Sequence, residues 1–133
     1  MRKVIFPRGR NFSVLNKVLV AGERSGRIVE VEAYGGEDDP GSHAWRGPTP
    51  RTELMYGPAG HWYVYLSYGV HWSANVVVSE PGTAAAVVIR AVEPLCGIDE
   101  MRAVRGRVHD RDLANDPGKL TKALGFAHEL NGM

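Results

Sequence analysis

The sequence predicts an α+β protein, with strands in its first part and short helices near its end. Several short stretches alternate between apolar and polar residues, as half-buried strands do. Turn-forming residues separate neighbouring stretches, which indicates hairpins. Beyond Pro94 the apolar spacing changes to that of helices, and a run of strands followed by helices is typical of α+β folds.

The composition is that of an ordinary soluble globular protein. The chain has 133 residues, of which 44% are hydrophobic and 23% charged, so we expect one domain over residues 1–133 with one core. No apolar run approaches the roughly 18 residues that cross a bilayer, and the start resembles no secretory signal. Cys96 is the sole cysteine, which excludes an intrachain disulfide and suits a reducing compartment.

The charge and motif content exclude several kinds of site. The net charge of +1 does not fit binding of nucleic acid by bulk attraction, although four arginines lie between Arg102 and Arg111. That segment alone is better interpreted as a solvated helix and loop. The five histidines form no i, i+4 pair and there is no zinc-type cysteine spacing, so we expect no metal. Gly35 and Gly36 lack a nucleotide-binding pattern, so we expect no cofactor.

The first predicted hairpin joins residues 17–20 to residues 28–34. Turns are expected at Ala21-Gly22 and Ser25-Gly26. Strict alternation over 28–34 places side chains on two faces. Val29, Val31 and Ala33 share one face, and Ile28, Glu30, Glu32 and Tyr34 share the other. Two carboxylates roughly 7 Å apart and a phenol therefore line one face, which by itself fits a half-exposed strand.

A long loop follows over residues 35–51 and contains His43. Long loops in small domains are often functional. The second predicted hairpin joins residues 62–67 to residues 70–78, with Tyr68-Gly69 as the turn. Turns usually carry small polar residues, so a tyrosine at the tip suggests a probe that inserts into something.

The remaining elements are a buried strand and two helices. Residues 83–92 predict a buried strand, and from residue 84 on they are apolar except for Arg90, which is either paired or an edge arginine reaching water. Residues 98–104 predict a short helix. Asp116 and Pro117 cap and start a second helix, which runs to residue 124 and is closed by Gly125. Residues 1–14 show little pattern and predict a poorly specified lead-in.

Taken together, these stretches closely resemble the alkyladenine (3-methyladenine) DNA glycosylase family. The similarity runs in matching order from about residue 17 to residue 130. It is carried by residues 27–34 (RIVEVEAY), His43, residues 63–69 (YVYLSYG), Asn75, residues 88–95 (VIRAVEPL) and residues 117–124 (PGKLTKAL). The first five of these matches are each weak alone, but they stand in register and are extended by the sixth, which makes chance similarity very improbable.

The resemblance implies a single mixed domain around a curved antiparallel sheet, with a protruding hairpin that enters the DNA minor groove. It implies removal of damaged purines from double-stranded DNA, without metal or cofactor. The site residues that it implies are Glu32 and Arg90 for catalysis, Tyr34, His43 and Tyr65 for stacking on the extruded base, Asn75 for disfavouring a purine 2-amino group, Tyr68 as the wedge, Met55 for contact with the opposite strand, and Lys119 for DNA binding.

The resemblance also sets expectations for partners and location. We expect a monomer, with a weak dimer possible through exposed sheet edges. We expect a cytoplasmic protein, at the nucleoid when bound to DNA, if the source is bacterial, and a nuclear one otherwise. Family members usually continue past the helix at 117–124, so we expect a short member that lacks the usual C-terminal strands.

Two alternatives stay open beside a glycosylase. A lesion-binding module would keep the aromatic residues but would not need Glu32. A sugar hydrolase would use Glu30 and Glu32 as its carboxylate pair, since roughly 7 Å falls in the range for an inverting enzyme, although side chains on one strand seldom converge. Spacing cannot choose between the two glutamates, and the resemblance alone points to Glu32. Because the motif holds no lysine, we expect a monofunctional enzyme without lyase activity.

Overall fold

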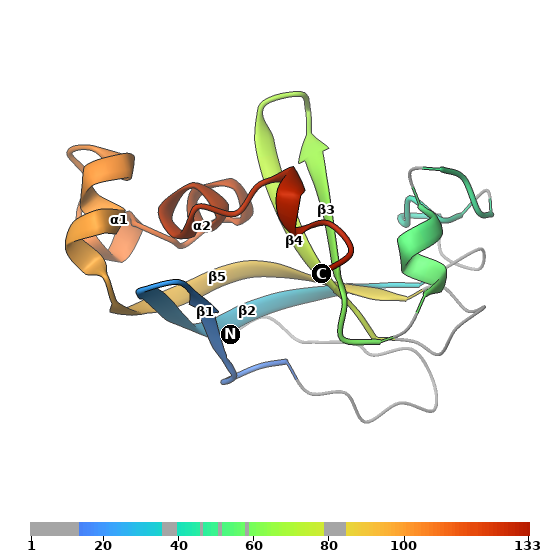
Figure 1. Cartoon of the computed structure of the whole chain (residues 1–133), viewed down its shortest axis with the longest axis horizontal. Helices are drawn as coiled ribbons and strands as arrows, with labels where there is room; N and C mark the ends of the chain where they lie inside the picture. Colours follow the sequence, from blue (N-terminus) through green and yellow to red (C-terminus); the bar gives the residue numbers. More distant parts are fainter. Residues whose placement is uncertain (1–13, 36–39, 46, 51, 58, 79–84) are drawn as a thin grey trace.

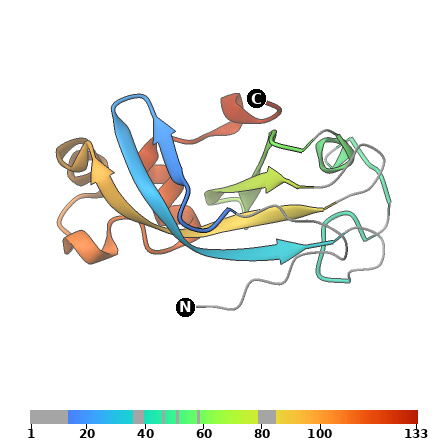
Figure 2. The same cartoon turned by 90° about the horizontal axis from the view of Figure 1, so that it is seen from below.

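The computed structural model describes residues 14–35, 40–45, 47–50, 52–57, 59–78 and 85–133. The lead-in expected before residue 14, the acidic loop segment 37–39 and the predicted strand start at 83–84 lie outside these ranges. The described residues form a five-stranded antiparallel sheet in the order β1-β2-β5-β4-β3, with two α-helices. This arrangement confirms the predicted α+β class, and the sheet is visibly curved (Figure 2).

The elements follow one another as the sequence predicts, from strands to helices (Figure 1). The strands are β1 (Val18–Ala21), β2 (Arg24–Tyr34), β3 (Trp62–Ser67), β4 (His71–Val77) and β5 (Ala86–Cys96). The helices are α1 (Ile98–Arg105) and α2 (Pro117–Leu124), with 3-10 helices η1 (Glu53–Tyr56), η2 (Asp110–Asp112) and η3 (His128–Leu130). The three 3-10 helices were not expected from the sequence.

The turn predicted at Ser25-Gly26 is wrong. Both residues belong to β2, and Gly26 pairs with Leu19 of β1. The chain turns at Gly22, where the sequence also predicted the end of the first strand, and its φ of 62° favours glycine in a tight hairpin. Gly26 serves packing, because a Cβ there would lie 2.7 Å from Cγ2 of Val92. Its glycine therefore allows β2 and β5 to approach closely.

The strict alternation predicted over residues 28–34 breaks near its start. Ile28 is 3% exposed and Val31 is 1% exposed, and both belong to the same core cluster. Val29, predicted to share a face with Val31, is 37% exposed. The pairing with β5 is irregular between Ile28 and Val31, and a bulge of this kind changes which face a side chain points to. The placement of Ile28 beside the glutamates is therefore wrong.

β5 extends further than predicted, through Pro94 to Cys96. Its pairing with β4 covers only residues 86–88, whereas its pairing with β2 continues to Cys96. Pro94 thus lies where β5 has a strand on one side only. A residue without an N–H group is tolerated at such a place, so the proline does not end the strand.

The two faces of the sheet are covered differently. Val87 belongs to the large core cluster with Met101 of α1 and Leu120 of α2, so the helices cover its face. The neighbouring Ala86 belongs to a second, smaller cluster with Met55 and Tyr63. Neighbours on a strand point to opposite faces, so the second cluster lies on the face away from the helices.

The predicted helix α2 has the capping expected from the sequence. The Asp116 carboxylate accepts hydrogen bonds from the backbone N–H groups of Gly118 (2.9 Å) and Lys119 (3.0 Å). Pro117 stands at the first turn, and Gly125 ends the helix with a φ of 75°. Local signals were sufficient here because each cap involves residues close in sequence.

The two sheet edges differ in how they are covered. At the β3 edge, the Trp62 N–H donates to the Met133 carbonyl and the Val64 N–H to Oδ1 of Asn131. At the β1 edge, Val18 and Val20 are 52% and 66% exposed. The weak dimer through sheet edges stays a prediction. Among the described residues, no helix is long and apolar enough to cross a membrane.

Candidate active site

A row of facing residues crosses four strands on the face away from the helices. Glu32 of β2 lies opposite Val88 of β5, Val88 lies opposite Asn75 of β4, and Asn75 lies opposite Tyr63 of β3. Directly opposed residues of antiparallel strands share a face. The pairing therefore gathers residues from separate predicted motifs onto one surface.

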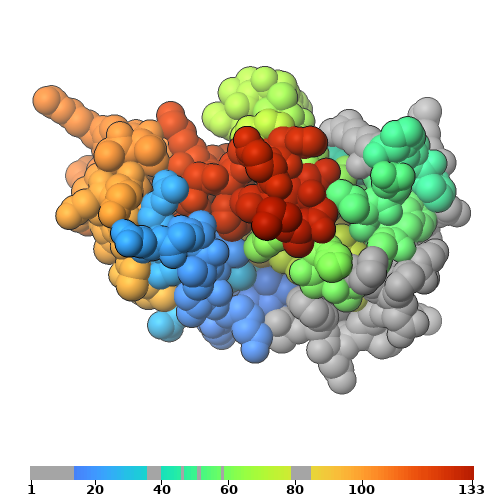
Figure 3. Space-filling model, in the orientation of Figure 1, coloured from blue at the N-terminus to red at the C-terminus, as the bar shows by residue number. Residues whose placement is uncertain are grey.

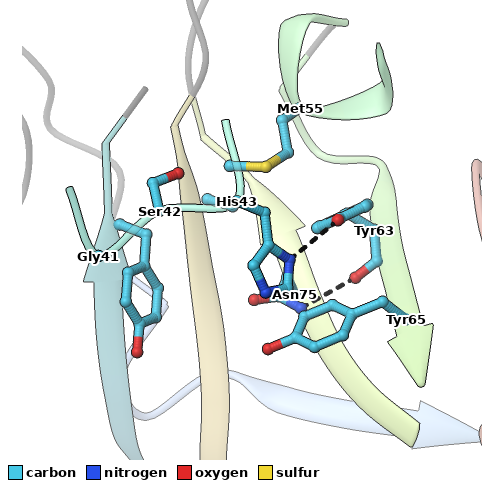
Figure 4. Close-up of a pocket in the computed structure, with 9 residues that line it drawn as sticks. Gly41, Ser42, His43, Met55, Tyr63, Tyr65 and Asn75 are labelled. Carbon is cyan, nitrogen blue, oxygen red and sulfur yellow. Dashed lines mark hydrogen bonds between the residues drawn. The ribbon is translucent and has the colours of Figure 1, made fainter. Parts of the chain in front are cut away.

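A pocket opens on this surface beneath the loop that carries His43 (Figure 4). It is lined by Tyr34, Gly41, Ser42, His43, Met55, Tyr63, Tyr65, Asn75 and Ala86. The space within it is about 340 Å³, including the part open to solvent. Tyr34, His43 and Tyr65, the three residues predicted to stack on a base, all line this pocket.

Aromatic rings dominate one wall of the pocket. The His43 and Tyr65 rings are 4.3 Å apart between centroids and inclined at 70°, an edge-to-face arrangement. Nδ1 of His43 lies 3.2 Å from the hydroxyl of Tyr63, a hydrogen bond drawn in Figure 4. This bond fixes the orientation of the imidazole ring.

Tyr63 is a site residue that the sequence analysis left out. It is 2% exposed, lines the pocket and holds His43. The signal was present, because Tyr63 and Tyr65 share one face of the alternating stretch 62–67. Its role became visible only once the loop had brought His43 to that face.

Asn75 lies at the base of the pocket and is 2% exposed. Its amide nitrogen Nδ2 donates to the backbone carbonyls of Tyr63 (3.1 Å) and Ser73 (3.4 Å). The amide is thus held by backbone groups of β3 and β4. A buried amide fixed in this way presents a defined polar surface to whatever fills the pocket.

Beside the pocket, Arg90 lies between two carboxylates. Its Nε is 3.3 Å from Oε1 of Glu30, and its Nη1 is 3.5 Å from Oε2 of Glu32. The three side chains are partly exposed, at 27%, 29% and 39% respectively. Of the two readings of Arg90, the paired one is confirmed. Both glutamates contact the same cation. The sequence did not predict this, because side chains on one strand were expected to point in parallel and not to converge.

Tyr34 joins the pocket to this charged group. Its hydroxyl donates to Oε1 of Glu32. Burial, and next the hydrogen bond to Glu32, raise the pKa of Tyr34 to about 12. The phenol therefore remains a neutral donor at neutral pH. Glu32 has a donor at each oxygen, from Tyr34 at Oε1 and from Arg90 at Oε2.

Tyr68 stands at the tip of the β3–β4 hairpin, as predicted. It is 99% exposed, and the hairpin protrudes at the top of Figure 3. The Val70 N–H donates to the Ser67 carbonyl (3.0 Å), and the two central residues have positive φ, 52° at Tyr68 and 66° at Gly69. Such turns favour asparagine or glycine, so tyrosine is a strained choice there.

Met55 and Lys119, both predicted to contact DNA, lie in different places, and Met55 is not at the surface. Met55 is 2% exposed and lines the pocket, so its side chain is not presented at the surface. Lys119 is partly buried on α2, and its Nζ donates to Oδ1 of Asn115 (3.3 Å). Its neighbour Gly118 lies against His71, which pairs with Ser67 at the turn end of the hairpin. Lys119 is therefore near the hairpin and outside the pocket.

Two arginines of the arginine-rich segment, Arg102 and Arg105, hold α1 to the residues that follow it. Arg102 forms ion pairs with Asp99 and Asp110, both at the surface. Arg105 donates from Nε to the Leu113 carbonyl at 3.0 Å. Within the part of the chain that the structure describes, no group of three or more His, Cys, Asp or Glu side chains could hold a metal ion.

Comparison with known proteins follows this geometry. The model of a family described as methylpurine-DNA glycosylase matches residues 12–133. This chain belongs to that family. The match includes both faces of the sheet and every residue of the candidate site, so the predicted resemblance to a 3-methyladenine glycosylase family is confirmed.

Curated members of the methylpurine-DNA glycosylase family resemble the chain over most of its length. A protein of Burkholderia cenocepacia named "Putative 3-methyladenine DNA glycosylase" is 51% identical over 122 residues. Proteins of the same name from Chlorobaculum parvum and Frankia casuarinae are 50% and 54% identical over 124 and 106 residues. These alignments cover 90%, 90% and 80% of this chain, but only 59%, 59% and 50% of the relatives. The chain thus spans little more than half the length of these relatives.

Proposed function

We propose that the chain acts as a DNA glycosylase that excises damaged purines from double-stranded DNA. One observation carries the proposal: the aromatic pocket and the Glu32–Arg90 pair lie side by side on one face of the sheet. Tyr34 belongs to both, since it lines the pocket and donates to Glu32. A base-binding wall next to a carboxylate is what cleavage at the sugar of an extruded nucleotide requires.

The pocket would hold the base after it leaves the duplex. Extrusion costs a few kcal/mol, and least for a damaged or mispaired base. Stacking returns about 1–3 kcal/mol per base. Tyr34, His43 and Tyr65 supply three rings for this purpose. Asn75 at the base of the pocket would contact the purine edge and disfavour a 2-amino group.

Glu32 would supply the general base. It would take a proton from a water molecule whose oxygen attacks C1′ of the sugar, while the N-glycosidic bond breaks and its electrons leave with the base. The carboxylate would also stabilise positive charge that develops on the sugar. Arg90, whose Nη1 lies 3.5 Å from Oε2 of Glu32, would hold that carboxylate in place and contact the nucleotide backbone. A cationic 3- or 7-alkyl purine leaves without an acid, whereas hypoxanthine would need a proton from a donor.

The hairpin would keep the duplex open. Tyr68 is exposed at the tip of a protruding element, and apolar wedges from the minor groove unstack neighbouring bases. Lys119, beside the glycine that packs against the turn end of the hairpin, would contact phosphate. Because phosphate contacts dominate such binding, affinity should fall steeply as salt rises. The buried position of Met55 supports a role in the pocket wall over contact with the opposite strand.

Single-turnover excision tests the proposal. The substrates are duplex oligonucleotides that carry 3-methyladenine, 7-methylguanine, hypoxanthine or ethenoadenine, with an undamaged duplex as control. We expect wild-type excision of at least one lesion and a loss of roughly 10²–10⁴-fold in Glu32→Gln. Equal cleavage by the variant would remove Glu32 from its role. Tight lesion binding without cleavage by either protein would favour a lesion-binding module.

We further propose that the reaction is a simple hydrolysis that leaves an abasic site. Among the described residues that line the pocket there is no lysine whose amine could form a Schiff base with the sugar. Borohydride treatment during turnover should trap no covalent protein–DNA adduct. The relatives named above are bacterial, so we propose the bacterial cytoplasm, and the nucleoid when DNA is bound, as the location.

A further inference from the structure

We propose that Glu30 is a positioning residue that fixes the guanidinium plane of Arg90 for the reaction at Glu32. The inference rests on the proposed function, because it assigns a task within that site. The two glutamates have the same chemistry and share a face of β2, but they contact different nitrogens of Arg90. The structure thereby separates their roles.

The geometry of the guanidinium group explains why a second carboxylate matters. The group is planar, and its nitrogens are fixed relative to one another. One contact, between Nη1 and Glu32, would leave the plane able to rotate about that contact. The second contact, between Nε and Oε1 of Glu30 at 3.3 Å, removes that freedom. Arg90 is thus held at two points from one strand.

The backbone supports the same assignment. The pairing of β2 with β5 is irregular on both sides of Glu30, which is matched with Ala91 and not with Arg90. Bulges beside active sites change the direction of side chains. Here the irregular pairing accompanies a carboxylate that approaches Nε of Arg90 from one side while Glu32 approaches Nη1. The same irregularity turns Ile28 into the core. The loss of regular strand pairing here therefore accompanies the contact between Glu30 and Arg90.

Glu30 also divides the positive charge of Arg90 between two carboxylates. Without Glu30, the guanidinium would pair with Glu32 alone and take a different position at that carboxylate. Loss of Glu30 would therefore change both the orientation of Arg90 and its ion pair with Glu32. Replacement of Glu30 should slow the chemical step while leaving the pocket that captures the base intact.

The test compares Glu30→Gln with Glu93→Gln, a matched change at an exposed glutamate of β5. We expect single-turnover excision to fall roughly ten- to a hundredfold in Glu30→Gln, with lesion affinity and unfolding midpoint close to wild type. Glu93→Gln should match wild type in all three. In an Arg90→Lys background, which keeps the charge but loses the planar group, Glu30→Gln should cause no further loss.

A readout that needs no activity is the NMR signal of the Arg90 Nε–H group. It should exchange slowly with solvent in wild type and in Glu93→Gln, and quickly in Glu30→Gln. An unchanged rate and signal in Glu30→Gln would overturn the inference and leave the proposed function standing. A rate loss matched by equal losses of lesion affinity and stability would also overturn it. If wild type excises no lesion, the proposed function fails, and the NMR comparison decides the positioning of Arg90 by itself.

Discussion

The two faces of the sheet use the same strands for opposite purposes. On the helix-covered face, Val87 and Ile89 pack without exposure against α2, and the side chains are apolar. On the pocket face, the adjacent positions place Glu32, Tyr34 and Arg90 partly in solvent, with their polar groups paired to one another. The difference shows that the buried apolar side chains of the helix-covered face stabilise the fold. The pocket face can therefore carry polar side chains that contribute little to packing.

The largest expected effect is a loss of stability from a cavity in the helix-covered face. Leu120→Ala removes a fully buried side chain of α2 and leaves a cavity, so the free energy of unfolding should fall by about 2–5 kcal/mol. Urea unfolding measures this change. Lesion affinity per folded molecule should stay at the wild-type value. A lowered affinity in the folded fraction would mean that the two faces are coupled more strongly than their separate clusters indicate.

A change on the pocket face should have the opposite pattern. Tyr65→Ala removes a stacking ring that is only partly buried, so lesion affinity should weaken by about 1–3 kcal/mol. Stability should change far less than in Leu120→Ala. Fluorescence anisotropy with lesion DNA and with undamaged DNA separates base capture from general DNA binding. An equal loss for both duplexes would contradict a specific role in stacking.

The hairpin tip offers a smaller effect in which stability and binding move in opposite directions. Tyr68→Asn should relieve the strain of a positive φ and raise stability by roughly 0.5–1 kcal/mol, while lesion capture weakens. Tyr68→Ser is the matched control, since it also loses the wedge but suits the turn less well. Thermal unfolding and lesion affinity are measured for both. Unchanged affinity in both variants would exclude a wedge at this position.

The smallest effect concerns pH. Because folding raises the pKa of Tyr34 to about 12, its contribution to stability is present below pH 10 and is lost as pH rises through about 12. Tyr34→Phe should therefore reduce the alkaline fall in stability between these values. Urea unfolding at a series of alkaline pH values measures the difference. Parallel curves for wild type and variant would show that Tyr34 does not titrate in that range.

Local patterns were good guides wherever the cause is local. The hairpin of β3 and β4, with Tyr68 at its tip, was predicted because the turn and both alternating strands are neighbours in sequence. The helix α2 was predicted because Asp116, Pro117 and Gly125 act within a turn of its ends. The polar face of β2 was also predicted for Glu32 and Tyr34, since alternation holds beyond the bulge, and Glu30 within the irregular stretch keeps its predicted place beside Glu32.

Local patterns failed where a distant strand decides. The bulge near Val29 depends on the pairing of β2 with β5, which are separated by about half the chain, so alternation could not reveal it. Gly26 looked like a turn residue until the closeness of Val92 explained it. Tyr63 gained a role only when a loop carried His43 to within 3.2 Å of its hydroxyl.

By itself, the sequence determined that Glu32 and Tyr34 share a face, that a turn lies at Tyr68-Gly69, where α2 begins and ends, and which family the motifs resemble. Only the tertiary structure decided that Arg90 lies between Glu30 and Glu32, and that Tyr34 links this group to the pocket. The physical reason is that ion pairs and hydrogen bonds act over a few ångströms in space, whatever the separation along the chain. Glu30 and Arg90 are 60 residues apart, and the irregular pairing of β2 with β5 brings them together.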